Sequence, residues 1–382
     1  MRVLIAFDKF KDSMNADEAC RLTAGAIRNR HPDWSIDSAP LTDGGDGFGR
    51  ILTHSAQGEL RKVTASGPFL ESRQGEYGLI EIDNLPAEAR TLLPGLPDSG
   101  RLALIEMASV NGLALVPGEK RNPWKTITVG TGELIRAAAE SGAVGILLGV
   151  GGSATNDLGF GALSGLGLKF LQADGRPVTS PTPGNWKRID RIEGALASDL
   201  PLIWIACDVD NPLLGERGAS AVFGPQKGLT AADLPNMEAG MKRMADLLCD
   251  HLGCRRSLQA QPGAGAAGGI SFGLMAATGA RLVSGADLMT AWLRLKDRIE
   301  KADMVITGEG RFDHSSLEGK GPGEVVAQAL ARGKRTLVFA GSIEDGLRSE
   351  AGLHAISPVD LPLNVALKEA AGNLVSTVNR VV

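Results

Sequence analysis

The sequence has 382 residues, a length at which chains usually divide into two domains, and its 43% hydrophobic and 22% charged residues are typical of a soluble globular protein. The net charge of −4, without any Lys/Arg-rich run, disfavours a nucleic-acid-binding protein, and no apolar stretch is long enough to span a membrane. Four cysteines in a chain of this length indicate a reducing compartment, so we expect a cytoplasmic protein.

Short apolar runs that end in Gly, Asp, Ser, Thr or Asn recur along the chain and predict strands that are buried on both faces. In chain order they are Val3–Phe7, Leu102–Ile105, Ile146–Val150, Leu202–Cys207, Met304–Thr307 and Thr336–Ala340. Helical patterns occur at 17–30, 131–141, 233–252, 287–301, 322–332 and 363–378. Asn15 and Glu18 resemble a capping box before the first helix. The alternation predicts an α/β fold with a parallel sheet, whose ligands bind beyond the carboxyl ends of the strands.

Two stretches interrupt this pattern. Residues 63–124 are rich in Pro and Gly with short strand-like pieces, and residues 172–200 resemble an excursion of turns. We therefore expect a second α/β domain inserted into the first.

The strongest candidate site is GVGGSATND at 149–157, a glycine loop that follows a predicted strand and leads into a helix. Its N–H groups, together with Ser153, Thr155 and Asn156, could cradle phosphate. The loop lacks the Gly-Lys-Ser/Thr ending of a Walker loop. Asp157 would sit badly beside phosphate without a cation, which suggests a role through Mg²⁺. The alternative is a strand-to-helix turn with an Asn/Asp cap.

Acidic side chains follow two further predicted strands. In TDGGDGF, Asp43 and Asp46 could bind metal or accept a proton, or one of them could cap a helix. In ACDVDNPL, Asp208 and Asp210 alternate along an extended segment and could converge on one cation. Asn211 follows them, and the alternative for this segment is an Asx-rich turn.

A third polar stretch, TGEGRFD, places Glu309, Arg311 and Asp313 at another strand end. Arg311 could clamp a carboxylate or a phosphoryl group through two hydrogen bonds, or it could form a local ion pair. Several lysines lie in loops at comparable places and are interpreted as ordinary surface lysines: Lys9, Lys11, Lys227 and Lys320.

These residue types favour phosphoryl transfer over two rival chemistries. Ser153 is not in a Gly-x-Ser-x-Gly motif and no histidine follows a strand with an obvious partner, which disfavours a Ser–His–Asp hydrolase. Gly263, Gly265 and Gly268 have the dinucleotide-binding spacing, but the polar CRRSLQAQP before them offers no strand. We therefore interpret 263–269 as a flexible or closely packed glycine turn. A phosphate cradle, carboxylates for Mg²⁺ and a cationic clamp are what phosphoryl transfer needs.

Longer motifs occur in order between residues 5 and 320, among them IAFDKFKDSMNADEA, IEMASVNGLALVP, RNPWKTITVGTGELIRAA, ACDVDNPLLGERGASAVFGPQKG and ITGEGRFDHSSLEGK. Together they closely resemble the bacterial glycerate kinases of the type-1 family, over nearly the whole chain. The sequence departs from the family pattern at Asp12, where glycine is common, and at Asp46, where glutamate is common. GKGPGEVV also replaces the usual GKVP stretch, which loosens any assignment built on Lys320.

The resemblance implies a two-domain α/β kinase that uses ATP and Mg²⁺ to phosphorylate D-glycerate, usually to 2-phosphoglycerate, with its active site in the cleft between the domains. We expect residues 1–62 and about 285–382 to form a Rossmann- or flavodoxin-like domain with a parallel sheet. Residues from about 63–284 would form the inserted second α/β domain. The expected partners are the small molecules D-glycerate and ATP, and a homodimer is a possible assembly.

We place roles on the motif positions. The expected substrate- or phosphate-binding residues are Asp8, Lys9, Lys11, Ser153, Thr155, Asn156, Asn211, Glu309 and Asp313. The expected metal ligands are Asp157, Asp208 and Asp210. Asp43 or Asp208 would take or orient the hydroxyl proton, and Arg311 would neutralise the carboxylate or the transferred phosphoryl group. The alternatives are a kinase of another small sugar acid, transfer to the 3-hydroxyl, an NAD-dependent oxidoreductase and a non-catalytic binding module.

Overall fold

The chain divides into two units by its internal contacts. The computed structural model describes residues 1–42, 44–318, 321–358 and 361–382. Unit 1 is Met1–Asp43 with Ala286–Val382, and unit 2 is Gly44–Gly285. From the sequence we expect the first boundary at residue 62, whereas the contacts change at 43–44. The reason is α2 (Phe48–Ser55), which packs on the strands of unit 2.

Unit 1 is built on a five-stranded sheet in which all neighbouring strands are parallel, in the order β15-β13-β11-β1-β2. The strands are β1 (Arg2–Phe7), β2 (Ser35–Ser38), β11 (Met304–Gly308), β13 (Arg335–Ala340) and β15 (Gly352–Ala355). The short strands β12 (Arg311–Phe312) and β14 (Ser342–Ile343) pair separately. Counted within the unit, the order is 2-1-3-4-5, which is the flavodoxin-like order. The predicted Rossmann- or flavodoxin-like domain is therefore confirmed.

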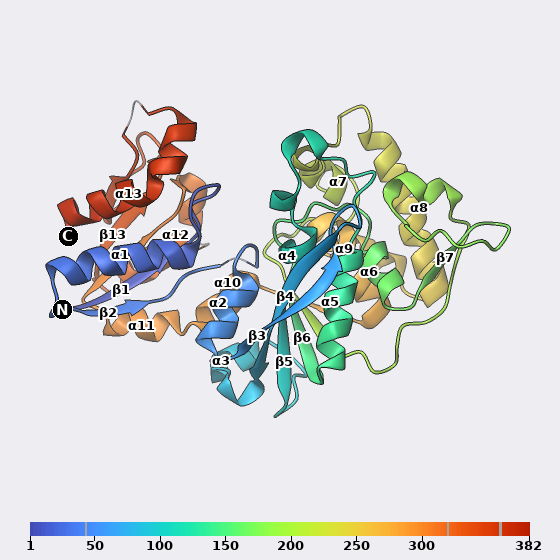
Figure 1. Ribbon diagram of the computed structural model, residues 1–382, viewed down its shortest axis with the longest axis horizontal. Coiled ribbons are helices and arrows are strands. Elements are labelled where there is room, and N and C mark those ends of the chain that lie inside the picture. Colours follow the sequence, from blue (N-terminus) through green and yellow to red (C-terminus); the bar gives the residue numbers. More distant parts are fainter. Residues whose placement is uncertain (43, 319–320, 359–360) are drawn as a thin grey trace. The chain divides into compact units, whose positions relative to one another are not determined.

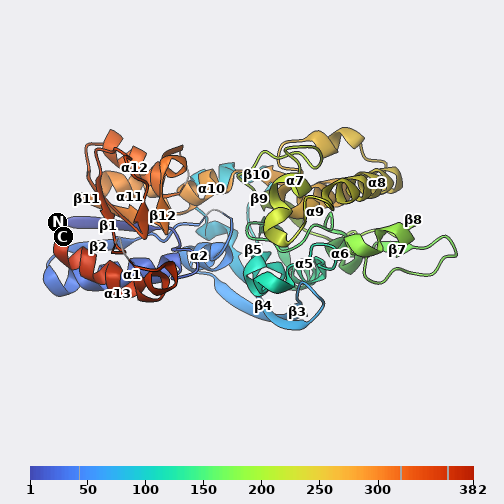
Figure 2. The ribbon, with the colours of Figure 1, turned by 90° about the horizontal axis from the view of Figure 1, so that it is seen from above.

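Helices cover both faces of this sheet, as Figures 1 and 2 show. On one face, α1 (Ala16–Arg30) and α13 (Leu363–Val381) pack together, and Phe339 of β13 is buried beneath them. On the other face lies α12 (Pro322–Ala331), whose Val326 packs against Val338. Phe339 and Val338 are neighbours in a strand, so their side chains point to opposite faces.

The predicted helix at 287–301 is two helices in the structure, α10 (Gly285–Trp292) and α11 (Leu295–Lys301). Arg294 between them has φ +52°, a left-handed conformation that ends one helix before the next begins. At the start of α1, the Asn15 side chain accepts a hydrogen bond from Glu18 N at 2.8 Å, which confirms the predicted N-cap.

Unit 2 contains a mixed sheet in the order β10-β9-β6-β5-β4-β3. The strands are β3 (Glu59–Ser66), β4 (Ser72–Glu81), β5 (Arg101–Glu106), β6 (Ala143–Gly149), β9 (Leu202–Ala206) and β10 (Arg281–Val283), with a separate pair of β7 (Lys169–Leu171) and β8 (Arg191–Glu193). The strands from β10 to β5 are parallel neighbours, so their carboxyl ends share one edge of the sheet. The long antiparallel hairpin of β3 and β4 was not predicted.

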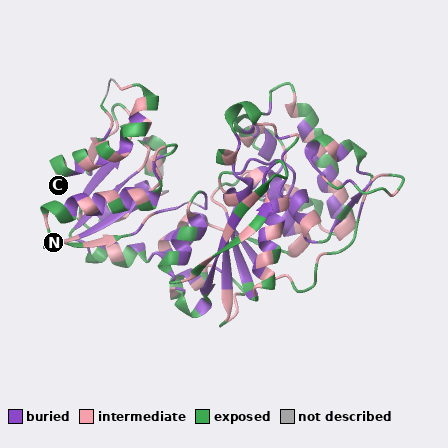
Figure 3. Cartoon of the chain, viewed as in Figure 1, coloured by how far each residue is buried: buried purple, intermediate pink, exposed green. Residues whose placement is uncertain are grey.

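Of the parallel strands of unit 2, β5, β6 and β9 are largely buried (Figure 3), whereas β10 is partly exposed. Ile146, Leu148 and Ile205 belong to the larger core, which the helices of the unit complete. The helices are α3 (Ala87–Thr91), α4 (Ala108–Asn111), α5 (Val129–Glu140), α6 (Phe160–Gly165), α7 (Ala219–Phe223), α8 (Leu234–Leu252) and α9 (Ala266–Thr278). Within the described ranges, no helix combines the length and apolar character needed to cross a membrane.

Candidate active site

Three loops meet at the carboxyl edge of the unit 2 sheet. The glycine turn that contains Gly44 packs against the loop after β6, because Gly151 N donates a hydrogen bond to Gly44 O at 3.0 Å. A Cβ on Gly151 would lie 2.7 Å from Gly45 Cα, so this contact requires glycine. A Cβ on Gly44 would lie 3.2 Å from the carbonyl of Ala206, at the end of β9. Two of the predicted polar stretches therefore lie side by side.

The loop after β6 is held from inside by a buried lysine. Lys227 Nζ donates to Ser153 Oγ at 2.9 Å and to the carbonyl of Thr155 at 2.6 Å. Lys227 is only 2% exposed, so its interpretation as a surface lysine is wrong. Burial lowers the pKa of Lys227 to about 7, although the charge of Asp157 acts in the opposite direction. The amine group of Lys227 is thus hydrogen-bonded to the candidate phosphate loop.

The other two predicted phosphate ligands of this loop lie deeper than Ser153. Thr155 and Asn156 are fully buried, whereas Ser153 is 6% exposed. Asn156 Nδ2 donates to Ser220 Oγ at 3.0 Å. Within the described part of the chain, Thr155 Oγ1 and Asn156 Oδ1 are buried without a hydrogen-bond partner. Such atoms cost free energy unless water or a ligand meets them.

Asp157 has a structural environment rather than that of a metal ligand. Its Oδ2 accepts hydrogen bonds from Thr128 N, Thr128 Oγ1 and Gly161 N, and its Oδ1 accepts one from Gly159 N. The side chain is fully buried, and burial raises its pKa in spite of these hydrogen bonds. Both carboxylate oxygens are therefore occupied in joining the loop to the start of α5 and α6.

The segment after β9 separates the two aspartates that were expected to converge. Asp208 Oδ1 accepts a hydrogen bond from Ser284 Oγ at 3.2 Å, just after β10. Asp210 is exposed, and Arg217 Nη2 donates to both of its oxygens, at 2.9 and 2.8 Å. Asn211 Nδ2 donates to the carbonyl of Arg217 at 2.7 Å. Asp210 and Asn211 thus fasten their own loop.

Within the described residues, no group of three or more His, Cys, Asp or Glu side chains lies close enough to hold a metal ion. The three aspartates assigned to metal binding, Asp157, Asp208 and Asp210, therefore do not form one cluster. Asp46 is exposed in the glycine turn, and its Oδ1 lies 4.0 Å from the Cβ position of Gly152. The carboxylates near the solvent at this edge thus include Asp46 and Asp208.

The Gly-x-Gly-x-x-Gly segment is a buried packing element of unit 2. No strand leads into it, because the 3₁₀ helix Arg256–Ala260 comes before it. A Cβ on Gly268 would lie 2.1 Å from the carbonyl of Thr155, and a Cβ on Gly265 would lie 2.2 Å from that of Pro212. These glycines let the segment pack against the loops after β6 and β9, and the interpretation as a closely packed turn is confirmed.

Unit 1 has its own polar edge at the carboxyl ends of β1 and β11. The connections that leave these two strands run to opposite faces of the sheet, which makes this the topological switch point where open α/β sheets bind ligands. Asp8 N donates to Gly308 O at 3.0 Å, and Lys9 N donates to Asp8 Oδ1 at 2.6 Å. The Asp8 carboxylate lies near the start of α12, 3.5 Å from the Cβ position of Gly321. Asp8 and Lys9 thus occupy the expected ligand position of the unit.

The other predicted residues of unit 1 follow β11. Glu309 lies directly after the strand, and its carbonyl accepts a hydrogen bond from Gly341 N at 3.1 Å. Arg311 forms an ion pair with Asp313 at 3.2 Å, which is the local pair considered as the alternative. The Ser315 hydroxyl donates to Asp313, and this bond is the main reason that the pKa of Asp313 is lowered.

The Lys11 side chain is exposed, and its backbone N lies 3.1 Å from the Cβ position of Gly310. Asp43 lies outside the described residues, as does Lys320.

Two functional candidates were missed at the level of sequence. Lys227 is one, and its only signal is its place among apolar neighbours in AVFGPQKGL. Glu106 is the other: it ends β5, and its carboxylate accepts a hydrogen bond from Gly49 N at 3.4 Å. Its position at a strand end was the same signal that selected the aspartates.

Comparison with known proteins agrees with this architecture. Residues 3–382 match the model of the glycerate kinase family. The chain is 36% identical to a glycerate kinase of Halalkalibacterium halodurans, over 96% of this chain and 93% of that protein. It is 37% identical to glycerate 2-kinase of Escherichia coli, over 94% and 90%.

A crystal structure tests the fold directly. A protein from Salmonella typhimurium LT2 that carries the name glycerate kinase 2 superposes with a TM-score of 0.78 at 34% identity, and the alignment covers 100% of this chain and 97% of that one. Glycerate kinases are phosphotransferases with an alcohol acceptor. The alternative of an NAD-dependent oxidoreductase, which the glycine motif had raised, is not supported by these comparisons. The chain belongs to the glycerate kinase family.

Proposed function

We propose that the protein is an ATP- and Mg²⁺-dependent kinase that phosphorylates the 2-hydroxyl of D-glycerate. The observation that carries the proposal is the carboxyl edge of the unit 2 sheet, where the glycine turn, the Ser153 loop and β9 meet in a member of the glycerate kinase family. The Escherichia coli relative, which is named glycerate 2-kinase, supports the choice of hydroxyl.

We assign phosphate binding to the loop after β6. Ser153 is more exposed than Thr155 and Asn156, and Lys227 donates a hydrogen bond to its hydroxyl. Thr155 Oγ1 and Asn156 Oδ1 would complete their hydrogen bonding with ordered water or with a ligand group. The buried ammonium of Lys227 adds positive potential behind the loop, which favours an anionic ligand in front of it.

The acceptor hydroxyl needs a group that orients it and takes its proton. Asp208 is half-buried at the end of β9, and Ser284 fixes one of its oxygens at 3.2 Å. A carboxylate held in this way can accept a hydrogen bond from an alcohol and receive the proton as phosphorus–oxygen bonding advances. Asp43 remains a second candidate for this role.

The anionic groups of the substrates need positive partners. We assign Lys9, Lys11 and Arg311 to the carboxylate of glycerate or to the transferred phosphoryl group. Arg311 is paired with Asp313, so it would exchange that partner on binding. Asp8, Glu309, Asp313 and Asn211 stay assigned to the support of the substrate groups.

One or two of the carboxylates at the edge of the unit 2 sheet could serve as ligands of Mg²⁺. Mg²⁺ in kinases is usually held by one or two carboxylates together with phosphate oxygens and water. Asp208 and Asp46 fit this pattern, whereas Asp157, with both oxygens hydrogen-bonded, does not. When bound, Mg²⁺ would offset the negative charge of the phosphate oxygens.

Formation of ADP with D-glycerate, L-glycerate and other small sugar acids tests the reaction and the substrate. We expect turnover with D-glycerate that requires Mg²⁺, and NMR of the product to show a phosphate on C2. Absence of ADP formation with all these acids would refute the kinase assignment, and a phosphate on C3 would refute the regiochemistry.

The role of Asp208 is tested by D208N, with D174N as the matched control. Asp174 is exposed and pairs with Arg176 at 2.7 Å between β7 and β8. We expect D208N to lower kcat at least 100-fold with a smaller change in KM, and D174N to keep kcat. A near-wild-type kcat in D208N would contradict the assignment.

A cytoplasmic location and a homodimer stay predictions. Size-exclusion chromatography with light scattering tests whether the protein is a homodimer.

A further inference from the structure

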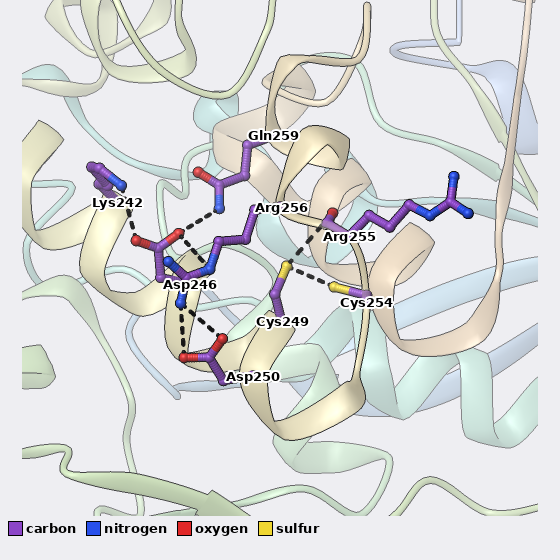
Figure 4. A network of polar contacts seen from close by, with 8 residues as sticks. All are labelled: Lys242, Asp246, Cys249, Asp250, Cys254, Arg255, Arg256 and Gln259. Atoms are coloured by element: carbon purple, nitrogen blue, oxygen red, sulfur yellow. Dashed lines mark hydrogen bonds and ion pairs between the residues drawn. The ribbon is translucent and has the colours of Figure 1, made fainter.

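Two cysteines meet where α8 ends. Cys249 lies in the last turn of the helix, Gly253 forms its left-handed C-cap, and Cys254 follows. Cys254 Sγ donates to Cys249 Sγ across 2.6 Å, and both residues are free thiols (Figure 4). Cys254 N also donates to Cys249 O at 3.1 Å. The turn therefore holds the two sulfurs together through its backbone.

The two thiols differ in their exposure to solvent. Cys249 is 1% exposed, whereas Cys254 is partly exposed. Burial is the main reason that the pKa of Cys249 is raised to about 12, and the charges of Asp246 and Asp250 raise it further. Because Cys254 is the more exposed of the two sulfurs, it is the one that meets a dissolved oxidant first.

Figure 4 shows the polar side chains around the two cysteines, which form hydrogen bonds and ion pairs with one another. Lys242 Nζ and Gln259 Nε2 each donate to Asp246 at 2.9 Å, and Arg256 Nη2 donates to both oxygens of Asp250. The Cys249 thiol donates a hydrogen bond to the carbonyl of Arg255 at 4.0 Å. The segment on both sides of the pair is thus fixed.

We propose that Cys249 and Cys254 are a dithiol site that a hydroperoxide converts into an intramolecular disulfide. A disulfide bond is roughly 2.05 Å long, so the sulfurs need to approach by well under 1 Å. This inference is independent of the proposed kinase reaction, because it uses neither substrate nor any residue assigned to it.

The chemistry balances with the peroxide as oxidant. The Cys254 thiolate attacks one peroxide oxygen, the O–O bond breaks, and the leaving oxygen takes a proton to give water. The Cys249 sulfur then attacks the Cys254 sulfenic acid, the S–O bond breaks, and a second water leaves. Two thiols and one H₂O₂ thus give one disulfide and two waters.

Trypsin releases both cysteines in one peptide, residues 244–255, because Arg243 and Arg255 bound it. The reduced full-length protein is treated with H₂O₂, denatured, alkylated and digested without reductant. We expect the peptide to be two hydrogens lighter and unalkylated, and to take up two alkyl groups after reduction. Cys20, which is buried, should stay reduced.

C249S and C254S are the matched variants, and neither should form the lighter peptide. The proposal is overturned if peptide 244–255 still takes up two alkyl groups under conditions that oxidise Cys207. It is also overturned if Cys254 forms only intermolecular disulfides.

Discussion

Lys227 and Ser153 are 74 residues apart in sequence and are joined by a hydrogen bond of 2.9 Å between Nζ and Oγ. The same ammonium group donates to the carbonyl of Thr155, so one buried charge holds two points of the loop after β6. An ammonium group has three N–H donors, and two of them are used in this way. The conformation of the loop therefore depends on one buried side chain.

Replacement of Lys227 by Met removes both hydrogen bonds and keeps most of the side-chain volume. We expect kcat/KM for ATP to fall at least tenfold, because a hydrogen bond from a charged group contributes about 1.5–3 kcal/mol. The unfolding free energy should change less, since the variant also removes a buried charge. Steady-state kinetics and urea unfolding measure the two effects. Lys242→Met, at an exposed pair with Asp246, is the control, and unchanged kinetics in K227M would refute the role.

The pKa of Lys227 makes stability depend on pH. In the folded protein the pKa is lowered to about 7, below the ordinary value of 10.5 for lysine, so between these values the unfolded chain binds more protons. The unfolding free energy contributed by this group therefore rises with pH across that window and is lowest below pH 7. Urea unfolding of wild type and K227M between pH 6 and pH 10 tests the sign. A difference between them that does not vary with pH would contradict it.

Asp157→Asn distinguishes a structural carboxylate from a metal ligand. The amide group places a donor where Asp157 Oδ1 or Oδ2 accepts hydrogen bonds from Thr128, Gly159 and Gly161. We expect a loss of about 2–4 kcal/mol in unfolding free energy, measured by urea denaturation. D174N should stay within about 0.5 kcal/mol of wild type. If D157N instead kept its stability and lost its Mg²⁺ dependence, metal binding would be restored to this residue.

Gly268 in α9 and Gly279 at its C-cap allow the cost of backbone strain to be compared with the cost of a steric clash. Gly279 has φ +69° with no heavy atom within 4 Å of its Cβ position, so Gly279→Ala should cost only about 1 kcal/mol. Gly268 has φ +73°, and its Cβ would lie 2.1 Å from Thr155 O. Gly268→Ala should therefore cost at least about 3 kcal/mol, and thermal unfolding compares the two. Equal costs would show that the contact with the loop is unimportant.

Local pattern was enough for the central strands of both sheets and for most of the longer helices. The apolar runs at Val3–Phe7 and Met304–Thr307 became β1 and β11 within a residue, because strands buried on both faces need continuous apolar sequence. The break at Arg294 was not predictable, since it depends on one left-handed residue. The hairpin of β3 and β4 was missed because β3 is largely exposed and lacks such a run.

The sequence predicted which residue types lie in the candidate site, but it did not predict which of these residues contact one another. Strand ends selected the loops around Ser153 and Asp208, and the structure places both loops at one edge of the unit 2 sheet, because parallel strands end at the same edge. The burial of Lys227 depends on acceptors more than 70 residues away, and the role of Asp157 depends on Thr128, 29 residues before it. Partners so distant leave no trace in a local pattern.

The discontinuity of unit 1 imposes an order on assembly during translation. β1 pairs with β2 nearby, but its other neighbour is β11, and Arg2 N bonds with Asp303 across 301 residues. Unit 2 is one uninterrupted segment, so it can fold on the ribosome while unit 1 still lacks three strands of its sheet. Until Ala286–Val382 emerges, β1 lacks its neighbour β11, and one edge of this apolar strand stays unpaired.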